Sequence, residues 1–570
     1  MSVALSQGTD AQKRPPGSDL SGGRDRVAAA SHPFGSSLLR WSFTVSWFFV
    51  PGSPAARRVL AVGALTVSLA VPSATTTEQA FAAPSAPPVP PASAPLLSNG
   101  QAPPAVAGPG PSIGVGMANR GATSARPAAP QQSARSWLAW LGIAALILLS
   151  LLLSVVSVTT LVWALHAWRS PEQLAATRFS PVRDGPRRRF SLLVPARHEE
   201  AVLGDTLDQL AAMDYADVEI LAIVGHDDPG TTAVAMAAAG RHPGRVKVVV
   251  DHCEPKNKPK ALNTALAACT GEVVGVFDAE DEVHPQLLNN VDGRFTDADA
   301  DIVQGGVQLM NVHSSWWALR NCLEYYFWFR SRLHFHAGQR FIPLGGNTVF
   351  IRTELIRAAG GWDEQCLAED CEIGVRLSTH GARVAVAYDS AVVTREETPG
   401  SLRSLVKQRT RWDQGFLQVL RKGVWRELPG RRQRLLARYT LASPFLQAFS
   451  GVMIPVSVFL MLAVSVPVWV VLISLTPLVP TVVTLAVEAT GFAEFCRLYG
   501  LKGRVRDYVF LVLGSVPYQM VLAFAAVRAV VREVRGQRGW EKTEHAGAHR
   551  MAPANTVIDL REPESAGVAA

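Results

Sequence analysis

Long apolar runs without charged residues predict membrane helices in this chain. No acidic or basic residue interrupts the stretch from Trp137 to Leu165, and this run exceeds the ~20 residues that a helix needs to cross a bilayer. A second uncharged run, Leu441 to Val487, is long enough for two such helices and has Pro467 near its middle. We therefore predict one transmembrane helix at 137–166 and two more at 441–489.

A further apolar run, from Tyr508 to Val527, has basic residues on both sides and Pro517 near its centre. A simple crossing would place basic residues on both faces of the membrane, although they normally concentrate on the cytoplasmic face. A bent, re-entrant or interfacial segment at 507–531 fits the sequence better. It would leave 532–570 as a cytoplasmic tail, and the sequence leaves the choice among these topologies open.

Basic residues after the first apolar run indicate which side of the membrane the chain enters. Arg169, Arg178 and Arg183 precede three consecutive arginines at 187–189. By the positive-inside rule, the residues that follow the helix at 137–166 lie in the cytoplasm. We therefore expect a multi-pass protein of the cell membrane whose segment 188–430 is cytoplasmic.

The segment 188–430 alternates strand-like and helix-like apolar patterns. Strands are predicted at 190–195, 218–224, 246–250 and 273–277, with a helix at 200–213 after the first strand. This alternation predicts an α/β domain, a sheet covered by helices. Ligands of such sheets bind beyond the carboxyl ends of the strands, so polar residues at those ends are the candidate site residues.

The first 135 residues have a different composition. Tracts of Ala, Pro, Ser and Gly between 72 and 134 hold too few large apolar residues to form a core, so 1–135 is predicted to be disordered. Within it, the apolar run 59–71 follows two arginines and precedes a small-residue sequence typical of a cleavage site, Ala80-Phe-Ala82. A signal peptide, a signal-anchor span and a start codon further downstream remain open, and we favour the span.

Composition and charge support a membrane protein. Of the 570 residues 48% are hydrophobic, and the formal net charge is +8. The basic residues cluster beside the apolar runs and form no single stripe, so they indicate membrane orientation and no nucleic-acid partner. None of the six cysteines shows the paired spacing of a zinc site, and we interpret them as reduced thiols.

An acidic string, Asp278-Ala-Glu280-Asp281, follows the predicted strand 273–277. Carboxylates in this position suit a hard divalent cation, Mg²⁺ or Mn²⁺, that carries a diphosphate. Such a metal would neutralise the charge that builds on a departing diphosphate. Such strings also occur in ordinary loops, so this one alone does not distinguish a metal site from a surface loop.

A second acidic pair, Glu369-Asp370, precedes a helical pattern. Acidic residues stabilise a helix amino terminus, which is one interpretation of the pair. The other is a general base that takes the proton from an attacking hydroxyl.

The third string is Gln408-Arg-Thr-Arg411-Trp412. On a helix, Gln408, Arg411 and Trp412 share one face. Arg411 could then clamp diphosphate oxygens, Trp412 could pack against a sugar ring and Gln408 could bind its hydroxyls. The alternative is an amphipathic surface helix with Trp412 in the core.

The order and spacing of these three strings resemble the processive family 2 glycosyltransferases, which include cellulose and hyaluronan synthases. The resemblance covers roughly 188–545 and implies a GT-A type nucleotide-sugar-binding domain beneath a bundle of membrane helices. It implies a catalytic role for Asp370 with Glu369, donor binding by Glu199, Asp227, Asp228, Lys258, Lys260, Asp278 and Arg411, and acceptor binding by Gly346, Asn347, Gln408 and Trp412. For the residues near 199 and 227, helix capping and turn formation are the alternative interpretation, and for the two lysines it is an ordinary basic loop.

The resemblance also implies a metal site at Asp278, Glu280 and Asp281. The family usually has Asp-x-Asp, whereas Glu280 occupies the third position here, so either Glu280 or Asp281 completes the site. The expected reaction is inverting transfer from a nucleotide diphosphate sugar, UDP-glucose or UDP-N-acetylglucosamine ahead of GDP-mannose, to a growing β-linked polysaccharide, with an accessory export subunit as a further expectation. The alternatives are transfer of a single sugar to a lipid or short glycan, and an inactive membrane scaffold or transport component.

Overall fold

The computed structural model describes residues 44–46, 64–66, 131–169, 187–463, 466–539, 541, 547 and 549–550. The chain divides into two compact units, 1–121 and 122–570. In the first unit, β1 (Thr44–Ser46) pairs antiparallel with β2 (Ala64–Thr66). Most of the region 1–135, including most of the run 59–71, lies outside the described residues, so both expectations for it stay predictions.

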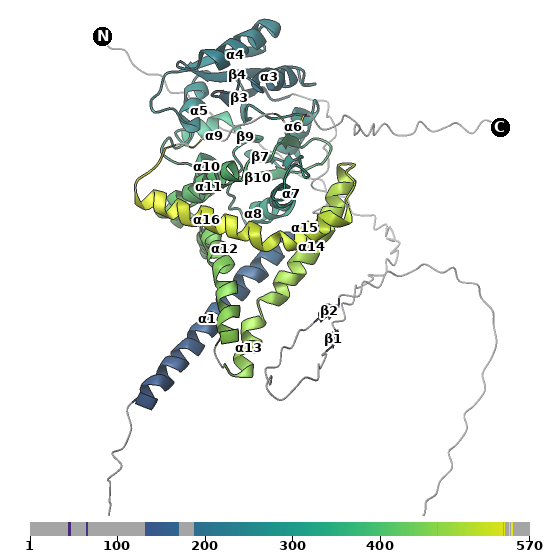
Figure 1. Ribbon diagram of the computed structural model, residues 1–570. Helices are drawn as coiled ribbons and strands as arrows, with labels where there is room; N and C mark the ends of the chain where they lie inside the picture. Colours follow the sequence, from purple (N-terminus) through teal and green to yellow (C-terminus); the bar gives the residue numbers. More distant parts are fainter. Residues whose placement is uncertain are drawn as a thin grey trace, which may run out of the picture. The chain divides into compact units, whose positions relative to one another are not determined.

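The second unit is built around a seven-stranded mixed sheet with the strand order β10-β7-β9-β6-β3-β4-β5 (Figure 1). Strands β3, β4, β5 and β6 run parallel, and β9 pairs antiparallel with β6 and β7. The bounds are β3 Phe190–Ala196, β4 Val218–Gly225, β5 Val246–Asp251, β6 Val273–Val276, β7 Ile302–Gly305, β9 Val349–Arg352 and β10 Val384–Ala387. A separate pair is formed by β8 (Val307–Leu309) and β11 (Thr394–Glu396). The sheet confirms the predicted α/β class, and the four predicted strands end within one residue of the observed ones.

Helices cover both faces of this sheet, which is why its strands read as continuous apolar runs. Every residue of β4 is buried. Side chains of a strand alternate between faces, so Leu192 packs in one core and Leu193 in the other. The first core is covered by α3 (Leu203–Ala211), α4 (Pro229–Arg241) and α6 (Leu287–Asp297), and the second by α5 (Lys258–Leu266), α7 (Ala318–Phe327), α9 (Thr353–Ala358) and α10 (Glu369–Thr379).

Two further helical segments matter for the site. Helix α7 continues through a π-helical turn, η2 (Trp328–Arg332), into α8 (Leu333–Gly338). Helix α11 (Leu402–Lys422) is capped by Ser401, whose hydroxyl accepts from the Ser404 N–H, and ends at Gly423 in the left-handed region. It is followed by the short η3 (Val424–Glu427).

Within the described part of the chain, three helices are long and apolar enough to cross a membrane: Trp140–Trp168, Arg431–Phe459 and Val468–Leu498. They correspond to α1 (Gln131–Leu165) with η1 (His166–Trp168), to α12 (Arg431–Ala463), and to α13 (Val468–Leu475) with α14 (Leu478–Leu498). The last two extend about ten residues beyond the predicted 441–489 at each end. An uncharged run marks only the part of a helix that lies in hydrocarbon, and the helix continues into its charged flanks.

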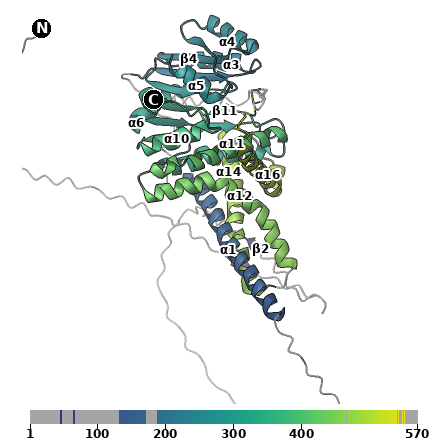
Figure 2. The same cartoon turned by 90° about the vertical axis from the view of Figure 1, so that its left-hand side faces the viewer.

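The run predicted as 507–531 forms two helices, α15 (Val505–Leu513) and α16 (Ser515–Val534), with a bend of 46° between them. The bend lies at Gly514, three residues before Pro517. A proline ring clashes with the carbonyl four residues earlier, which here is that of Leu513, and this explains the position. Helix α16 packs on α11 and α12, and both views show it lying crosswise to the long helices α1 and α12 (Figures 1 and 2).

Candidate active site

One cavity of about 870 Å³ connects the carboxyl ends of the central strands with the long apolar helices that could cross a membrane. Its lining begins at residues after β3, β4 and β6 and passes α5, α10 and α11. It ends at residues of α1, α12, α14 and α16. It brings together these predicted site residues: Glu199, Lys258, Asp278, Glu280, Gly346, Asn347, Glu369, Asp370, Gln408, Arg411 and Trp412.

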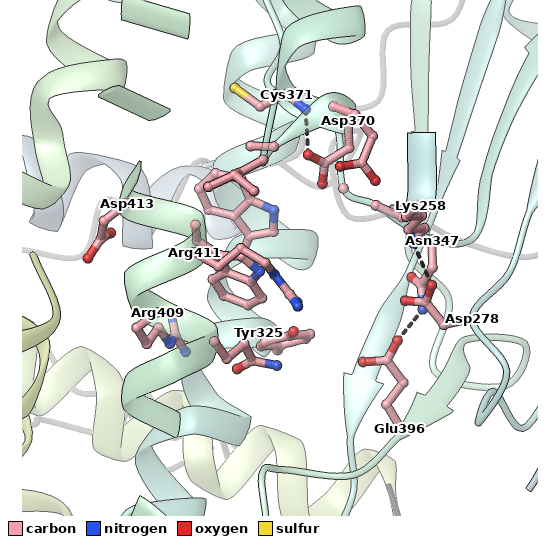
Figure 3. Close-up of a pocket in the computed structure, with 18 of the residues that line it drawn as sticks. Lys258, Asp278, Tyr325, Asn347, Asp370, Cys371, Glu396, Arg409, Arg411 and Asp413 are labelled. Atoms are coloured by element: carbon pink, nitrogen blue, oxygen red, sulfur yellow. Dashed lines mark hydrogen bonds and ion pairs between the residues drawn. The ribbon is translucent and has the colours of Figure 1, made fainter. Parts of the chain in front are cut away.

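Lys258 is the cation at the centre of the acidic end of this cavity. It is the first residue of α5, which Asn257 caps by accepting from the Lys260 N–H at 3.0 Å. Its Nζ donates to Asp278 Oδ1 at 2.5 Å and to the Gly346 carbonyl at 2.9 Å (Figure 3). Burial alone would lower the pKa of Lys258, but Asp278 and Glu369 raise it above its ordinary value, so the lysine stays charged.

The acidic loop after β6 divides its carboxylates between the cavity and the interior. Asp278 and Glu280 line the cavity, whereas Asp281 is fully buried and accepts from the Asp278 N–H at 2.9 Å and from Asn347 Nδ2 at 3.0 Å. Burial raises the pKa of Asp281, and Glu396, Asp278 and Glu280 raise it further. A divalent cation would relieve this repulsion among oxygen ligands of the kind that Mg²⁺ and Mn²⁺ prefer. The chemistry of the loop therefore fits a divalent metal, and Asp278 and Glu280 are its carboxylates that face the cavity; their role as metal ligands stays a prediction.

Two residues at this loop were not found from the sequence. Glu396, at the end of β11, lines the cavity and accepts from Asn347 Nδ2. Arg550, in the tail after α16, donates through Nη2 to the carbonyls of Glu280 and Asp281, both at 3.1 Å. Neither residue carries a local motif, because each reaches the loop through a contact between segments far apart in the chain.

The pair Glu369-Asp370 lies in the first turn of α10, as the helix interpretation predicts, and the catalytic interpretation stays a prediction. The Cys371 N–H donates to Asp370 Oδ1 at 2.7 Å. Burial raises the pKa of Glu369 to about 7, with the neighbouring Asp370 adding to the effect. Burial also raises the pKa of Asp370, against the Cys371 N–H and the charge of Lys258. Two adjacent carboxyl groups whose pKa values are both raised by burial are suited to proton transfer.

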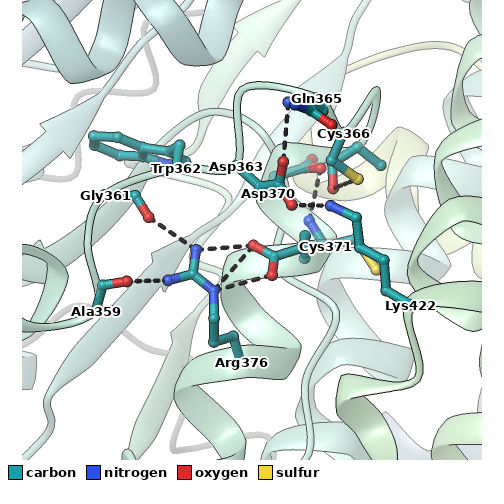
Figure 4. A network of polar contacts seen from close by, with 12 residues as sticks. Ala359, Gly361, Trp362, Asp363, Gln365, Cys366, Asp370, Cys371, Arg376 and Lys422 are labelled. Carbon is teal, nitrogen blue, oxygen red and sulfur yellow. Dashed lines mark hydrogen bonds and ion pairs between the residues drawn. The ribbon is translucent and has the colours of Figure 1, made fainter. Parts of the chain in front are cut away.

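The start of α10 is fixed by a network of polar contacts that Figure 4 shows. Arg376 donates to Glu372 at 2.9 Å on its own helix and to the Gly361 carbonyl at 2.8 Å in the preceding loop. Lys422, at the end of α11, forms an ion pair with Asp363 in the same loop. These contacts hold the loop before Asp370 between α10 and α11.

Helix α11 presents the third string to the cavity as predicted, with Gln408, Arg411 and Trp412 in the lining. Figure 3 shows Arg411 projecting toward the wall that carries Lys258 and Asp278. The ring of Trp412 lies 6.1 Å from that of Tyr325 in α7. Aromatic and guanidinium groups therefore lie opposite the carboxylates.

The remaining predicted residues lie outside the cavity lining. Asp228 caps α4, accepting from the Thr231 N–H at 3.2 Å, and also accepts from the His198 N–H at 2.6 Å. Asp227 pairs with Arg197 at 2.8 Å, and Lys260 donates to the Glu254 carbonyl at 2.7 Å. Their donor-binding roles stay predictions, and the capping interpretation describes the contacts of Asp228.

A different set of possible metal ligands lies at the edge of the cavity. His198, Glu200 and Asp228 place ligand atoms within 4.8 Å of one another. His198 and Glu200 are exposed, and Asp228 is engaged as the helix cap.

Residues 186–415 match the family model described as Glycosyltransferase like family 2. This region is therefore similar to the family 2 glycosyltransferases. Its mixed sheet with flanking helices is the GT-A fold that was predicted, so the coarser part of the resemblance is confirmed.

Curated relatives match the same region. A beta-monoglucosyldiacylglycerol synthase of Synechocystis sp. is 28% identical over 274 residues, which is 45% of this chain and 56% of the relative. A poly-beta-1,6-N-acetyl-D-glucosamine synthase of Staphylococcus aureus is 23% identical over 256 residues, 43% of this chain and 58% of the relative. The chain thus spans about half the length of the curated relatives that it matches.

Among solved structures, the mannosyltransferase PcManGT of Pyrobaculum calidifontis, in complex with GDP-Man and Mn²⁺, is similar to this chain. It is 19% identical with a TM-score of 0.45, and the match covers 69% of this chain and 99% of that one.

Proposed function

We propose that the protein is an inverting glycosyltransferase that moves a sugar from a nucleotide diphosphate sugar to a hydroxyl of a membrane lipid. The observation that carries this proposal is the continuity of the cavity. Its lining includes Asp278 and Asp370 at one end and Trp163, Ser443 and Thr484 of the apolar helices at the other. A polar donor from the aqueous side and an acceptor from the bilayer can meet in such a space.

At the donor end, Asp278 and Glu280 would hold Mg²⁺ or Mn²⁺. The bound cation would neutralise charge on the leaving diphosphate. Arg411 and Lys258 add positive charge on either side of the same space, and guanidinium groups bind phosphate oxygens through paired donors. A UDP-sugar is the donor that we expect.

In catalysis, Asp370 would accept the proton of the attacking hydroxyl. Its raised pKa makes it a stronger base than an exposed carboxylate, provided that it is ionised when the acceptor arrives. Lys258 favours that ionised form. Attack from the face opposite the leaving group, in one step, would convert an α-linked donor into a β-linked product.

A lipid acceptor accounts for the membrane end of the cavity. Large apolar side chains such as Leu148, Val155 and Phe459 are exposed on α1 and α12, where a bilayer would cover them. The relatives named as monoglucosyldiacylglycerol synthases support a lipid product over a polymer. We further propose a multi-pass protein with its α/β domain on the cytoplasmic side, as the basic residues after α1 predict.

Polysaccharide synthesis is a second candidate because polar groups line the same end of the cavity. Thr160, Gln447, Thr484 and Glu488 belong to helices that are otherwise apolar. Such groups can bind the hydroxyls of a sugar chain, and one relative is named as a poly-N-acetylglucosamine synthase. An accessory export subunit belongs to this candidate only.

The test uses purified full-length protein in lipid, with Mg²⁺ or Mn²⁺ and a panel of radiolabelled nucleotide sugars. We expect label from one donor in a small lipid product with wild type and none with Asp370→Asn. Label in a high-molecular-weight product would support the second candidate. If no donor is transferred or hydrolysed, both candidate functions are contradicted, and the inactive membrane scaffold is the interpretation that remains.

A further inference from the structure

The helix α7–η2–α8 carries a π-helical turn where it passes the membrane end of the cavity. Within this turn, Trp328, Phe329 and Arg332 all line the cavity. A π turn inserts an extra residue into a helix, costs hydrogen-bond geometry and occurs frequently at functional sites. Here it places a cationic side chain beside α1 and α12.

The guanidinium of Arg332 lies against two tryptophan rings. Its central carbon is 3.8 Å from the ring centre of Trp163 in α1 and 4.8 Å from that of Trp328. Contacts of this kind use the flat faces of a guanidinium. The N–H groups lie in the plane of the guanidinium, so stacking on the rings leaves their capacity to donate hydrogen bonds.

One N–H donor of Arg332, at Nη2, already has a partner in Ser443, and Pro444 makes that hydroxyl oxygen available. Because Pro444 lacks an N–H, it leaves the carbonyl of Thr440 without its usual helix partner, and the Ser443 hydroxyl donates to that carbonyl at 2.8 Å. The same Ser443 oxygen is then free to accept from Arg332 Nη2 at 3.1 Å. The Nε of Arg332 is buried and has no hydrogen-bond partner.

Arg332 also lacks an acidic partner within the part of the chain that the structure describes. The other arginines of this region are paired: Arg320 with Glu488 at 3.0 Å, Arg330 with Glu494 at 2.8 Å and Arg409 with Glu324 at 2.8 Å. Glu324, whose charge also acts on Arg332, is therefore already engaged. Arg332 is partly buried, and a cation withdrawn from water without an anion is costly, so such groups in proteins are usually paired or bind a ligand.

We propose that Arg332, held between Trp163 and Trp328 with Ser443, binds the phosphate of an anionic lipid acceptor. The inference rests on the proposed function and deepens it, because it names the class of lipid. The free in-plane donors suit a phosphate oxygen, and Trp163 lies near the end of the span Trp140–Trp168. Tryptophan is typical of that depth, where lipid headgroups begin.

The reacting hydroxyl would belong to the same headgroup. Its proton passes to Asp370, its oxygen forms the new bond to the anomeric carbon of the sugar, and the bond from that carbon to the donor diphosphate breaks. The nucleoside diphosphate leaves with that electron pair. The phosphate held by Arg332 keeps all its bonds, so a phospholipid with a free headgroup hydroxyl fits and a neutral diacylglycerol lacks the group that Arg332 needs.

The experiment compares dioleoyl phosphatidylglycerol with dioleoylglycerol as acceptors for the full-length protein in mixed micelles. We expect wild type to prefer the anionic lipid in kcat/KM. Arg332→Gln should lose on the order of tenfold to a hundredfold of that value, the range that one charge-assisted contact gives, with the loss mainly in KM. Donor hydrolysis without acceptor should stay unchanged, which shows that the variant is folded, and Arg332→Lys should restore part of the loss.

The matched control is Arg432→Gln, which removes an exposed arginine at the start of α12. An equal loss in both variants would mean general attraction to an anionic surface and would overturn the proposal. A wild-type preference for dioleoylglycerol would also overturn the proposal. So would inhibition by inorganic phosphate in a protein that transfers no sugar to phosphatidylglycerol.

Native mass spectrometry of phosphatidylglycerol retained without donor tests the subsite independently of transfer. If wild type retains phosphatidylglycerol and Arg332→Gln does not, the lipid subsite is supported. This holds even if the only product is a polymer, and in that case only the proposed function fails. Equal retention in both proteins would overturn the subsite whatever the product is.

Discussion

Glu369 and Asp370 are adjacent carboxyl groups in one buried corner of the cavity, and their shared titration predicts a pH profile. Burial raises the pKa of Asp370 and raises that of Glu369 to about 7. A group with a raised pKa takes up its proton at a higher pH than usual, and a base works only without that proton. We therefore expect kcat to fall on the acidic side at a higher pH than an exposed aspartate would give.

Two variants separate the roles of the pair. Asp370→Asn should reduce kcat by on the order of a hundredfold or more, because it removes the proposed base. Glu369→Gln should move the acid limb of the kcat profile to lower pH by about one unit, because loss of a neighbouring negative charge lets Asp370 ionise more readily. An acid limb that stays in place in Glu369→Gln would contradict the coupling.

Arg550 gives a second prediction for a single residue. Because its guanidinium holds the carbonyls of Glu280 and Asp281, Arg550→Ala should loosen the acidic loop. We expect the Mn²⁺ concentration for half-maximal activity to rise several-fold, while Arg550→Lys recovers part of the difference. Arg535→Ala is the control, since Arg535 is exposed at the end of α16. An unchanged metal requirement in Arg550→Ala would show that the loop holds its shape without the tail.

These residues also show what the sequence could and could not predict. Asp370 and Arg411 belong to short strings that can be recognised in the sequence, and both line the cavity. Arg550, Glu396 and Arg332 act through contacts between distant segments, and nothing in their neighbours along the chain indicates those contacts. Asp228 shows the reverse case, since an acidic residue after a strand serves equally well as a helix cap.

Helix α11 approaches the loop before Asp370 so closely that only glycine fits between them. A Cβ at Gly415 would lie 2.3 Å from the Ala368 Cβ and 2.6 Å from the Ala368 backbone nitrogen. Gly415→Ala should therefore push the string at 408–412 away from Asp370. We expect the free energy of unfolding to fall by roughly 1–3 kcal/mol, and kcat to fall more than the donor KM rises.

The control for this prediction is Gly240→Ala in α4, where an added Cβ meets no atom within 4 Å. Alanine in such a position should stabilise the helix by roughly 0.5–1 kcal/mol relative to glycine. Thermal unfolding and steady-state kinetics of both variants are the measurements. A Gly415→Ala variant with wild-type kcat would mean that the loop adjusts without moving the base.

The accuracy of prediction differed between kinds of element for a physical reason. Strands such as β3 and β4 are buried on both faces, so their apolar runs begin and end with the strand. Helices α12 and α14 extend past their apolar runs into the charged flanks, where packing against neighbouring helices supports them. Pro517 predicted a bend between α15 and α16. The bend lies earlier, at Gly514, because the proline ring clashes with the carbonyl of Leu513.

At the largest scale, the second unit is organised around one cavity, which has a charged end and an end lined by apolar helices. The α/β domain supplies the charged end of the cavity, and α1, α12 and α14 supply the end that a bilayer would surround. Neither end is complete without the other, since α11 and η2 belong to the α/β region but line the cavity as it approaches the long apolar helices. Closing the membrane end should therefore stop transfer and leave donor chemistry intact.

Thr484→Trp tests this division. Thr484 lines the cavity from α14, and an indole there would fill the proposed route of the lipid to Asp370. We expect sugar transfer to lipid to fall about tenfold or more, while metal-dependent hydrolysis of the donor stays near wild type. Thr490→Trp is the matched control because Thr490 is exposed on the same helix. Equal loss of transfer and hydrolysis in Thr484→Trp alone would mean that the two ends of the cavity do not act separately, whereas unchanged transfer would place the acceptor route elsewhere.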